Sequence, residues 1–110
     1  MSKVHHVQIE DGYEPLFNVL MEALEQAQSG KGKVRHADGE PFDKQIICEV
    51  GRRVGLGYQL GQSVKKIYES QRLQGEHGVK ELLGSINYQV AAIIVRREQA
   101  EADRMMEGGE

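Results

Sequence analysis

The stretch that decides the fold is Val79-Lys80-Glu81-Leu82-Leu83-Gly84-Ser85-Ile86-Asn87-Tyr88-Gln89-Val90-Ala91-Ala92-Ile93. Its large aliphatic residues recur at alternating intervals of four and three positions, and they are Val79, Leu83, Ile86, Val90 and Ile93. This spacing is typical of a heptad seam on an α-helix. A helix that continues to Met105 is about 40 Å long at about 1.5 Å per residue, which is more than three short helices can cover. We therefore expect an all-α fold that forms a dimer or a larger homo-oligomer through the 79–93 seam.

Three short helices are predicted upstream of the long one, so the expected fold is a small helical bundle. The first begins at Glu14-Pro15 and ends at Gly30, because proline suits the first turn of a helix and glycine its C-terminal cap. The second begins at Glu40-Pro41 and ends at Gly55, and the third covers about residues 58–71. The residues expected to face the core are Leu16, Leu20, Ala23, Leu24 and Ala27 in the first helix, Phe42, Ile46, Val50 and Val54 in the second, and Leu60, Val64 and Ile67 in the third.

The length of 110 residues fits one domain. We expect this domain over residues 13–106, after a flexible N-terminal arm at 1–12 and before a disordered tail at 107–110. The chain has four Tyr, two Phe and no Trp, so its core must consist mainly of small aliphatic side chains. Such a core is shallow, and oligomerisation is a natural way for the chain to bury more surface.

Although the net charge of the chain is −3, its middle part is basic. Residues 31–72 contain nine Lys and Arg against five Asp and Glu, whereas the remainder contains five against twelve. The overall charge argues against general nucleic-acid binding, which needs a broadly positive face. No secretory segment and no apolar run approaching 18 residues is present, so we expect no membrane partner and a cytoplasmic location. The single Cys48 lies in the apolar run Ile46-Ile47-Cys48, where a small core residue is expected.

Two glycine-rich segments, residues 30–41 and 55–66, carry most of this basic character, and each leads into a predicted helix. The backbone N–H groups of a helix N-terminus attract phosphate, and glycine lets a ligand approach the backbone closely. We assign Lys65 and Lys66 to phosphate, Tyr58 to base stacking, and Arg35 and His36 to loop closure. The full set of candidate ligand-binding residues is Lys33, Arg35, His36, Tyr58, Gln62, Lys65, Lys66 and Arg72.

The same segments also allow a purely structural interpretation. Gly55 and Gly57 then form a tight turn between two helices, Gly61 permits close packing, and the lysines are only solvated. Arg52 and Arg53 fall in the last turn of the second predicted helix, where they either stabilise the negative helix end or contact a ligand.

The carboxylates suggest a second function, which is metal-dependent hydrolysis. All-α nucleotide pyrophosphohydrolases of the MazG kind hold magnesium with a Glu-x-x-Glu and a later Glu-x-x-Asp on facing helices. Glu22 and Glu25 supply the first pattern, but Glu81 is followed at the matching distance by Gly84. Because half of the motif is absent, no catalytic residue, metal ligand or cofactor is assigned, and magnesium is expected only under this alternative.

Several of these motifs resemble a known family. Its pattern is matched by Glu40-Pro41-Phe42-Asp43, by Gly55-Leu56-Gly57-Tyr58-Gln59-Leu60-Gly61-Gln62-Ser63-Val64-Lys65, and by Glu81-Leu82 and Tyr88. Together they resemble a small helical domain of unknown function that is common in bacteriophages and is sometimes attached to phage nucleotide kinases. The likeness covers about residues 36–95, but Gln62, Lys66 and Asn87 stand where that family usually has Asn, Tyr and Trp. The resemblance implies a phage or prophage origin, a host cytoplasm and a nucleotide-related context without a known reaction.

We therefore expect a phage-type helical protein that binds a phosphorylated small ligand, a nucleotide or a cyclic nucleotide signal, without turnover. Such a protein can act against host defence by sequestering the signal. One alternative is a MazG-like pyrophosphohydrolase that uses Glu22 and Glu25. The other is a protein-interaction module that inhibits a host factor through the long helix, with Ile86 in the contact.

Overall fold

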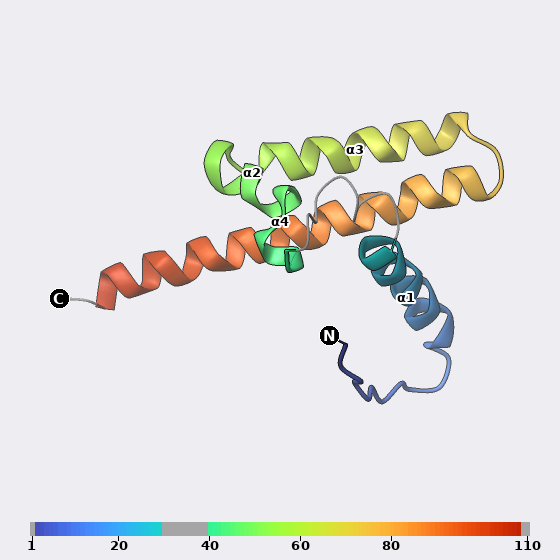
Figure 1. The fold of residues 1–110 in the computed structure, drawn as a ribbon, viewed down its shortest axis with the longest axis horizontal. Helices are drawn as coiled ribbons and strands as arrows, with labels where there is room; N and C mark the ends of the chain where they lie inside the picture. Colours follow the sequence, from blue (N-terminus) through green and yellow to red (C-terminus); the bar gives the residue numbers. More distant parts are fainter. Residues whose placement is uncertain (1, 30–39, 109–110) are drawn as a thin grey trace.

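The computed structural model describes residues 2–29 and 40–108, and within them the chain is helical and contains no strand (Figure 1). The elements are α1 (Glu14–Ser29), the short 3-10 helix η2 (Phe42–Lys44), α2 (Ile46–Val54), α3 (Gly57–Arg72) and α4 (Glu76–Gly108). The prediction of an all-α fold with one long C-terminal helix is confirmed. Among the described helices, none combines the length and the apolar character that a bilayer span requires.

The helix boundaries follow the local signals in the sequence with two exceptions. α1 begins at Glu14 as predicted, and α3 extends one residue further at each end than predicted. The predicted second helix is in two parts, because Gln45 is extended (φ −77°, ψ 164°) between η2 and α2. Glu107 and Gly108, the first two residues of the predicted tail, belong to α4. The predicted cap at Gly30 and residues 109–110 lie outside the described residues.

α3 and α4 run side by side as an antiparallel hairpin, which forms the frame of the molecule (Figure 1). Gly75, with φ +57°, lies in the connection between them. Gly78 permits a close approach, because a Cβ at this position would lie 2.9 Å from the Ser70 carbonyl oxygen. Further along the hairpin, Ser63 Oγ donates a hydrogen bond of 3.1 Å to the carbonyl oxygen of Ser85. Small residues on both helices therefore form this contact.

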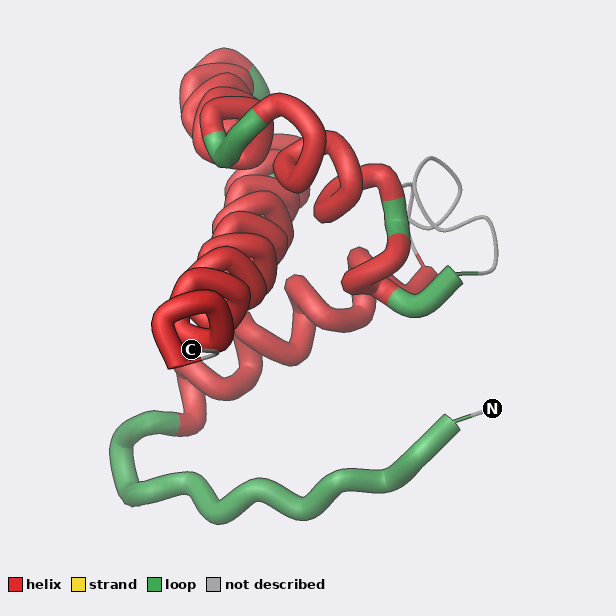
Figure 2. The backbone as a smooth tube through the Cα atoms, turned by 90° about the vertical axis from the view of Figure 1, so that its left-hand side faces the viewer, coloured by secondary structure: helices red, strands yellow, loops and turns green. Residues whose placement is uncertain are grey.

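α1 and α2 pack on the same side of the hairpin (Figure 2). Asn87 Nδ2 donates a hydrogen bond of 3.0 Å to the carbonyl oxygen of Ala23, which joins α1 to α4. α2 adds its buried residues to a core that consists of Ile47, Cys48, Tyr88, Ala91 and Val95, with Phe42, Leu56 and Tyr58 packed against it. The other side of the hairpin, at the left of Figure 2, carries no further helix in the described part of the chain.

A buried glutamine joins α2 to α3. The side chain of Gln59 is fully buried, and its Nε2 donates a hydrogen bond of 3.0 Å to the carbonyl oxygen of Ile47. Gly51 makes room for this side chain, because a Cβ at position 51 would overlap the Gln59 amide. Gly55, with φ +99°, reverses the chain between the two helices in a conformation that favours glycine. These contacts fix the direction in which α3 leaves the turn.

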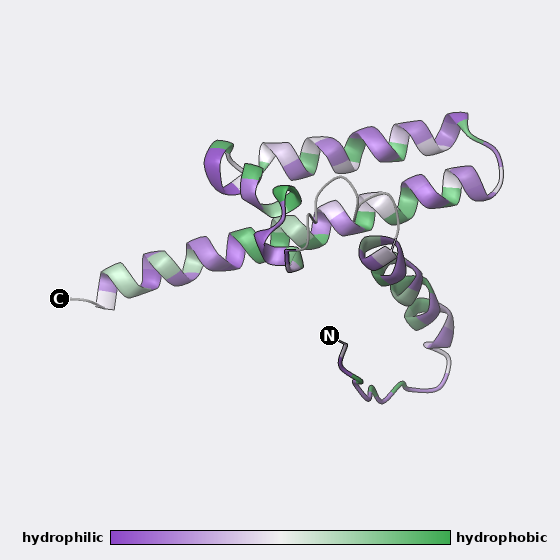
Figure 3. Cartoon of the chain, viewed as in Figure 1, coloured by the Kyte–Doolittle hydropathy of each residue, from purple (hydrophilic) through white to green (hydrophobic). Residues whose placement is uncertain are grey.

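Most of the large aliphatic residues predicted to face the core lie on the surface instead. The exposed ones are Leu16, Leu20 and Leu24 of α1, Ile46 and Val54 of α2, and Leu60, Val64 and Ile67 of α3. Ala23 is buried as predicted, whereas Leu83, which was predicted to lie in the seam between copies, is buried within the chain. For α3 the reason is that small residues form its contact with α4, so that the longer side chains lie beside this contact. Figure 3 shows that hydrophobic residues also recur along the length of α1.

The molecule is extended for its size. Its radius of gyration is 15.9 Å, whereas a compact domain of this length has about 13 Å. Its accessible surface is 8653 Å² for a mass of 12.3 kDa, whereas a compact monomer of that mass exposes about 6,100 Å². The C-terminal part of α4 extends beyond α3 (Figure 1). The isolated chain therefore leaves much surface uncovered.

Candidate ligand-binding surface

α3 begins at the glycine turn that was predicted to prepare a phosphate site. The backbone N–H of Tyr58 donates to the carbonyl oxygen of Gly55 at 3.3 Å, and that of Leu60 donates to Leu56 at 3.0 Å. The Tyr58 donor of the first turn is therefore used within the turn itself, whereas the Leu60 bond is the first regular hydrogen bond of the helix. The helix N-terminus is thus partly occupied, and side chains of α3 supply the other candidate contacts.

At Gly57 and Gly61 no side chain of the described residues covers the backbone of α3. No neighbouring atom lies within 4 Å of the place where a Cβ would stand at either position. Glycine within a helix destabilises it by about 1 kcal/mol relative to alanine. The close-packing role considered for Gly61 is therefore wrong within the described chain, and its backbone is accessible from outside.

Gln62 lies at the centre of the predicted residues on α3. Residues three or four positions apart are neighbours on a helix surface. Tyr58 therefore lies one turn before Gln62, and Lys65 and Lys66 lie one turn after it. Arg72 follows two turns beyond Lys65 on the same face. The continuous helix α3 thus brings five of the eight candidates onto adjoining positions, which we call the Gln62 surface.

Lys66 and Tyr58 are linked through one aromatic ring of α4. Tyr88 meets Tyr58 edge to face, with ring centroids 6.0 Å apart and an interplanar angle of 79°. Lys66 Nζ lies 5.9 Å from the centroid of the Tyr88 ring and 3.1 Å from Glu81 Oε2. A cation and an aromatic ring of the predicted site are therefore held in place by the same neighbour.

The other two cations of the Gln62 surface differ in their partners. Arg72 Nη2 lies 2.6 Å from Glu69 Oε2, and this hydrogen-bonded pair lowers the pKa of the Glu69 carboxyl and raises the pKa of the Arg72 guanidinium. Lys65 is exposed and forms no ion pair with a described residue. An arriving anion therefore finds Lys65 accessible, and it must compete with a carboxylate for Arg72.

The remaining three candidates, Lys33, Arg35 and His36, belong to residues 30–39 and lie outside the described residues. Their assignment to loop closure stays a prediction. The surface that the structure describes therefore consists of α3 and its neighbours on α4.

A cavity of about 800 Å³ lies between α1, η2, α3 and α4, and Lys66 and Tyr88 form part of its wall. Four carboxylates also line it, namely Glu22, Glu25, Glu76 and Glu81, together with Lys80 and His77. The described lining is therefore acidic, which favours cations over phosphates. Within residues 2–29 and 40–108, however, no three His, Cys, Asp or Glu side chains are grouped so that they could hold a metal ion.

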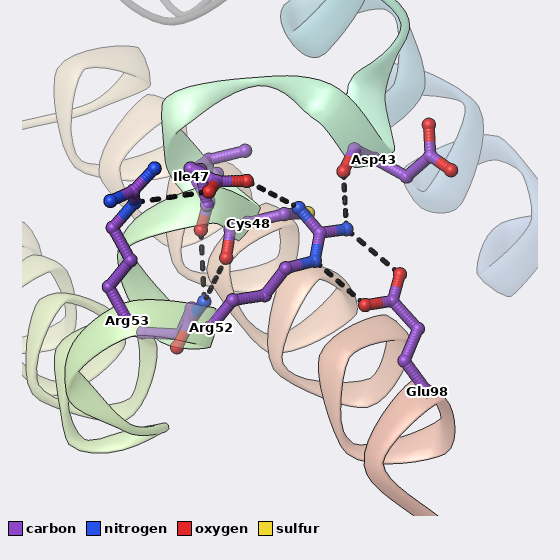
Figure 4. Close-up of polar contacts among 8 residues, drawn as sticks. Asp43, Ile47, Cys48, Arg52, Arg53 and Glu98 are labelled. Carbon is purple, nitrogen blue, oxygen red and sulfur yellow. Dashed lines mark hydrogen bonds and ion pairs between the residues drawn. The ribbon is translucent and has the colours of Figure 1, made fainter. Parts of the chain in front are cut away.

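Arg52 joins three elements of the fold and is fully engaged (Figure 4). Its Nε and Nη2 donate to the Glu98 carboxylate at 2.7 and 2.8 Å, Nη2 also donates to the Asp43 carbonyl oxygen at 2.5 Å, and Nη1 donates to Glu49 at 3.0 Å. These hydrogen bonds lower the pKa of both carboxyl groups. Arg53 donates to Glu49 as well, at 3.1 Å. The ligand role considered for Arg52 therefore gives way to a structural one.

Cys48 is a core residue, as predicted. Its side chain is 0% exposed, and burial raises the pKa of its thiol to about 11. A thiol with this pKa stays protonated at neutral pH, so it is a poor nucleophile.

No family model, no curated protein and no solved structure matches the chain. The resemblance to the phage domain, and a phage origin with it, therefore stays a hypothesis. The function must be inferred from the residues of the Gln62 surface and of the cavity.

Proposed function

We propose that this chain binds a small phosphorylated ligand, a nucleotide or a cyclic nucleotide, at the Gln62 surface of α3. The observation that carries the proposal is the contact of Tyr88 with both Tyr58 and Lys66. Tyr58 and Lys66 lie about 12 Å apart along the helix axis at about 1.5 Å per residue. A nucleobase at one end and a phosphate at the other fit an extended surface of this kind.

The phosphate lies over Gln62 in this arrangement, between Lys65 and Lys66. Hydrogen bonds from a cationic side chain to a phosphate are about twice as strong as those between neutral groups. The bare backbone at Gly61 lets the phosphate come close to the helix, because no side chain and no neighbouring atom covers it. Arg72 is placed to meet a second phosphate further along α3.

The groups of the Gln62 surface bind and neutralise a phosphate. This surface carries two lysines, an arginine, a glutamine amide and a tyrosine. At neutral pH each of these groups is a cation or a hydrogen-bond donor, and none is a strong general base. We therefore infer binding without turnover. If the ligand is a cyclic nucleotide signal, such binding lowers its free concentration and sequesters it, as an anti-defence protein of a phage would.

Calorimetry tests this proposal with a panel of nucleoside mono-, di- and triphosphates and cyclic mono- and dinucleotides. We expect micromolar or tighter binding of at least one member. Lys65→Ala with Lys66→Ala should weaken it about 30-fold or more, since two charge-assisted contacts of at least about 1 kcal/mol each are lost. Arg96→Ala with Arg97→Ala removes the same charge from α4 and should leave the affinity nearly unchanged. Absence of binding to every member would reject the proposal.

A second function is supported by a separate observation, which is that Glu22, Glu25 and Glu81 line one cavity. This is the cavity that a MazG-like pyrophosphohydrolase would use to hold magnesium. It stands second because these carboxylates do not form a metal-binding group within the described chain. Magnesium-dependent release of pyrophosphate from a deoxynucleoside triphosphate, abolished by Glu22→Ala, would establish it.

A further inference from the structure

α3 carries an exposed apolar row on the side away from the Gln62 surface. The row consists of Leu60, Val64 and Ile67, which are 51, 51 and 39% exposed. Tyr58, Gln62 and Lys65 belong to the Gln62 surface, and each residue of the apolar row comes two positions after one of them. Two positions correspond to about 200° around an α-helix. The apolar row and the Gln62 surface therefore lie on nearly opposite sides of α3.

α4 carries a matching row formed by Leu82, Ile86, Val90 and Ile93. Leu82, Val90 and Ile93 are 44, 39 and 49% exposed, and Ile86 is half-buried. The residues of α4 that contact the other helices lie elsewhere on its circumference, and they include Glu81 and Ser85 toward α3, Asn87 toward α1, and Tyr88, Ala91 and Val95 in the core. Residues 82–95 contain no charged residue at all. The row is thus an uncharged strip that residues 2–29 and 40–108 leave uncovered.

The two rows face the same way. Tyr58 packs against the core cluster to which α2 contributes, so the opposite side of α3 points away from α2. The row on α4 likewise avoids the contacts with α1 and α2. Figure 2 shows α2 on one side of the hairpin and no helix of the described residues on the other. We call the combined surface the hairpin face, and it consists of Leu60, Val64, Ile67, Leu82, Ile86, Val90 and Ile93.

We propose that a second copy of this chain covers the hairpin face in a two-fold symmetric dimer. In such a dimer each surface meets its own copy, so the surface must be complementary to itself. An uncharged apolar face satisfies this condition, whereas a face with charges of one sign would repel its copy. The interface differs from the seam predicted from the sequence, because α3 contributes three of its seven residues and Leu83 is buried inside the chain.

The available area agrees with a weak dimer that forms at high concentration. α3 has 16 residues and is therefore about 24 Å long, and two packed helices are about 20 Å wide. The hairpin face thus measures at most about 480 Å² on each copy, or about 960 Å² in total, which is below the area of about 1,200 Å² at which stable interfaces begin and is in the range of weak, concentration-dependent ones. The chain exposes 8653 Å², about 2,500 Å² more than a compact monomer, so the dimer removes only part of this excess.

Analytical ultracentrifugation of the full chain tests the dimer. We expect a mass of twice 12.3 kDa for the wild type. Val64→Lys on α3 and Ile93→Lys on α4 should each raise the dimer dissociation constant about 100-fold or more, because each puts two uncompensated charges into the symmetric interface. Leu20→Lys on α1 is the matched control, since Leu20 is also half exposed, at 47%, but lies outside the hairpin face.

Circular dichroism identifies any lysine variant that fails to fold, and the variant on the other helix then provides the test. A wild type that stays monomeric at high concentration would overturn the dimer, and so would an assembly that Leu20→Lys dissociates while Val64→Lys and Ile93→Lys do not. A wild type that is monomeric and instead binds an unrelated protein through Ile86 would favour the interaction-module alternative. Since the Gln62 surface lies on the other side of α3, folded Val64→Lys should still bind the nucleotide, so the two proposals can fail separately.

Discussion

Lys66 and Glu81 form an ion pair across the contact between α3 and α4, with Nζ 3.1 Å from Oε2. Both side chains are partly buried, at 25 and 30% exposed. Gly84 lies beneath the stem of the lysine, because a Cβ at this position would be 2.8 Å from Lys66 Cδ. A phosphate that binds Lys66 must therefore displace a carboxylate that is already in place.

Glu81→Gln should strengthen the binding of the phosphorylated ligand. The substitution keeps the size of the side chain and removes the competing charge, which is worth about 1 kcal/mol or about fivefold in affinity. Calorimetry with the best ligand of the nucleotide panel measures this gain. Glu76→Gln removes a charge from the same cavity wall without breaking an ion pair among the described residues, so it should give a smaller gain. Equal gains would show that general charge, and not competition for Lys66, is responsible.

Gly61→Ala should stabilise the free protein and weaken ligand binding. The added methyl group meets no atom within 4 Å, and alanine favours a helix over glycine by about 1 kcal/mol, which raises the melting temperature by several degrees. The same methyl group stands where the ligand approaches the backbone. Thermal unfolding and calorimetry measure the two effects, and a more stable variant with unchanged affinity would contradict a close approach at this position.

Gly51→Ala should destabilise the fold by about 1–3 kcal/mol, since its methyl group overlaps the buried Gln59 side chain. Urea denaturation measures the loss. Gly57→Ala is the control, because a Cβ there meets open space. When Gln59→Ala is already present, the additional effect of Gly51→Ala should be much smaller. If the losses in the free energy of unfolding from the two substitutions simply add, the methyl group at position 51 must clash with a group other than the Gln59 side chain.

Arg52→Met should destabilise the fold by about 1–2 kcal/mol at pH 7, since partly exposed ion pairs and the hydrogen bond to Asp43 are lost. Arg52 lowers the pKa of Glu98 and Glu49 below the ordinary value of 4.5. This stabilisation is present above pH 4.5 and is lost as the pH falls through the lowered pKa values. The difference between wild type and variant should therefore shrink on acidification, as urea denaturation at pH 7 and pH 3 can measure.

Arg104→Met provides the comparison, because Arg104 pairs only with Glu101 on an exposed part of α4 within the described chain. It should change the free energy of unfolding very little at either pH. A gap between wild type and Arg52→Met that stays constant with pH would contradict the proposed role of the carboxylates.

The positions of the helices could be predicted because their signals are local. Pro15 marks the start of α1, Gly55 and Gly75 lie in the turns before and after α3, and the aliphatic period identifies α4. The buried faces could not be predicted in the same way, because Ser63, Ser85 and Gly78 form the contact where large aliphatics were expected. A heptad pattern indicates a helix that packs, but it does not say whether the partner is the same chain or a second copy.

The candidate site, too, could be predicted only in part from the sequence. The helical period alone places Tyr58, Gln62, Lys65 and Lys66 together, so this part of the site follows from the sequence. The partners of the cations do not, since Glu81 is 15 residues from Lys66 and Glu98 is 46 residues from Arg52. Such pairs depend on how α3, α2 and α4 are arranged in space, and no local pattern encodes that.

An NMR titration of the labelled protein with the nucleotide that binds best in calorimetry tests whether the ligand occupies the Gln62 surface. We predict that the largest amide shifts fall at Tyr58, Gly61, Gln62, Lys65 and Lys66, with or without magnesium. Shifts that appear only with magnesium and centre on Glu22 and Glu25 would contradict it and favour the hydrolase. Shifts confined to the hairpin face would contradict it as well.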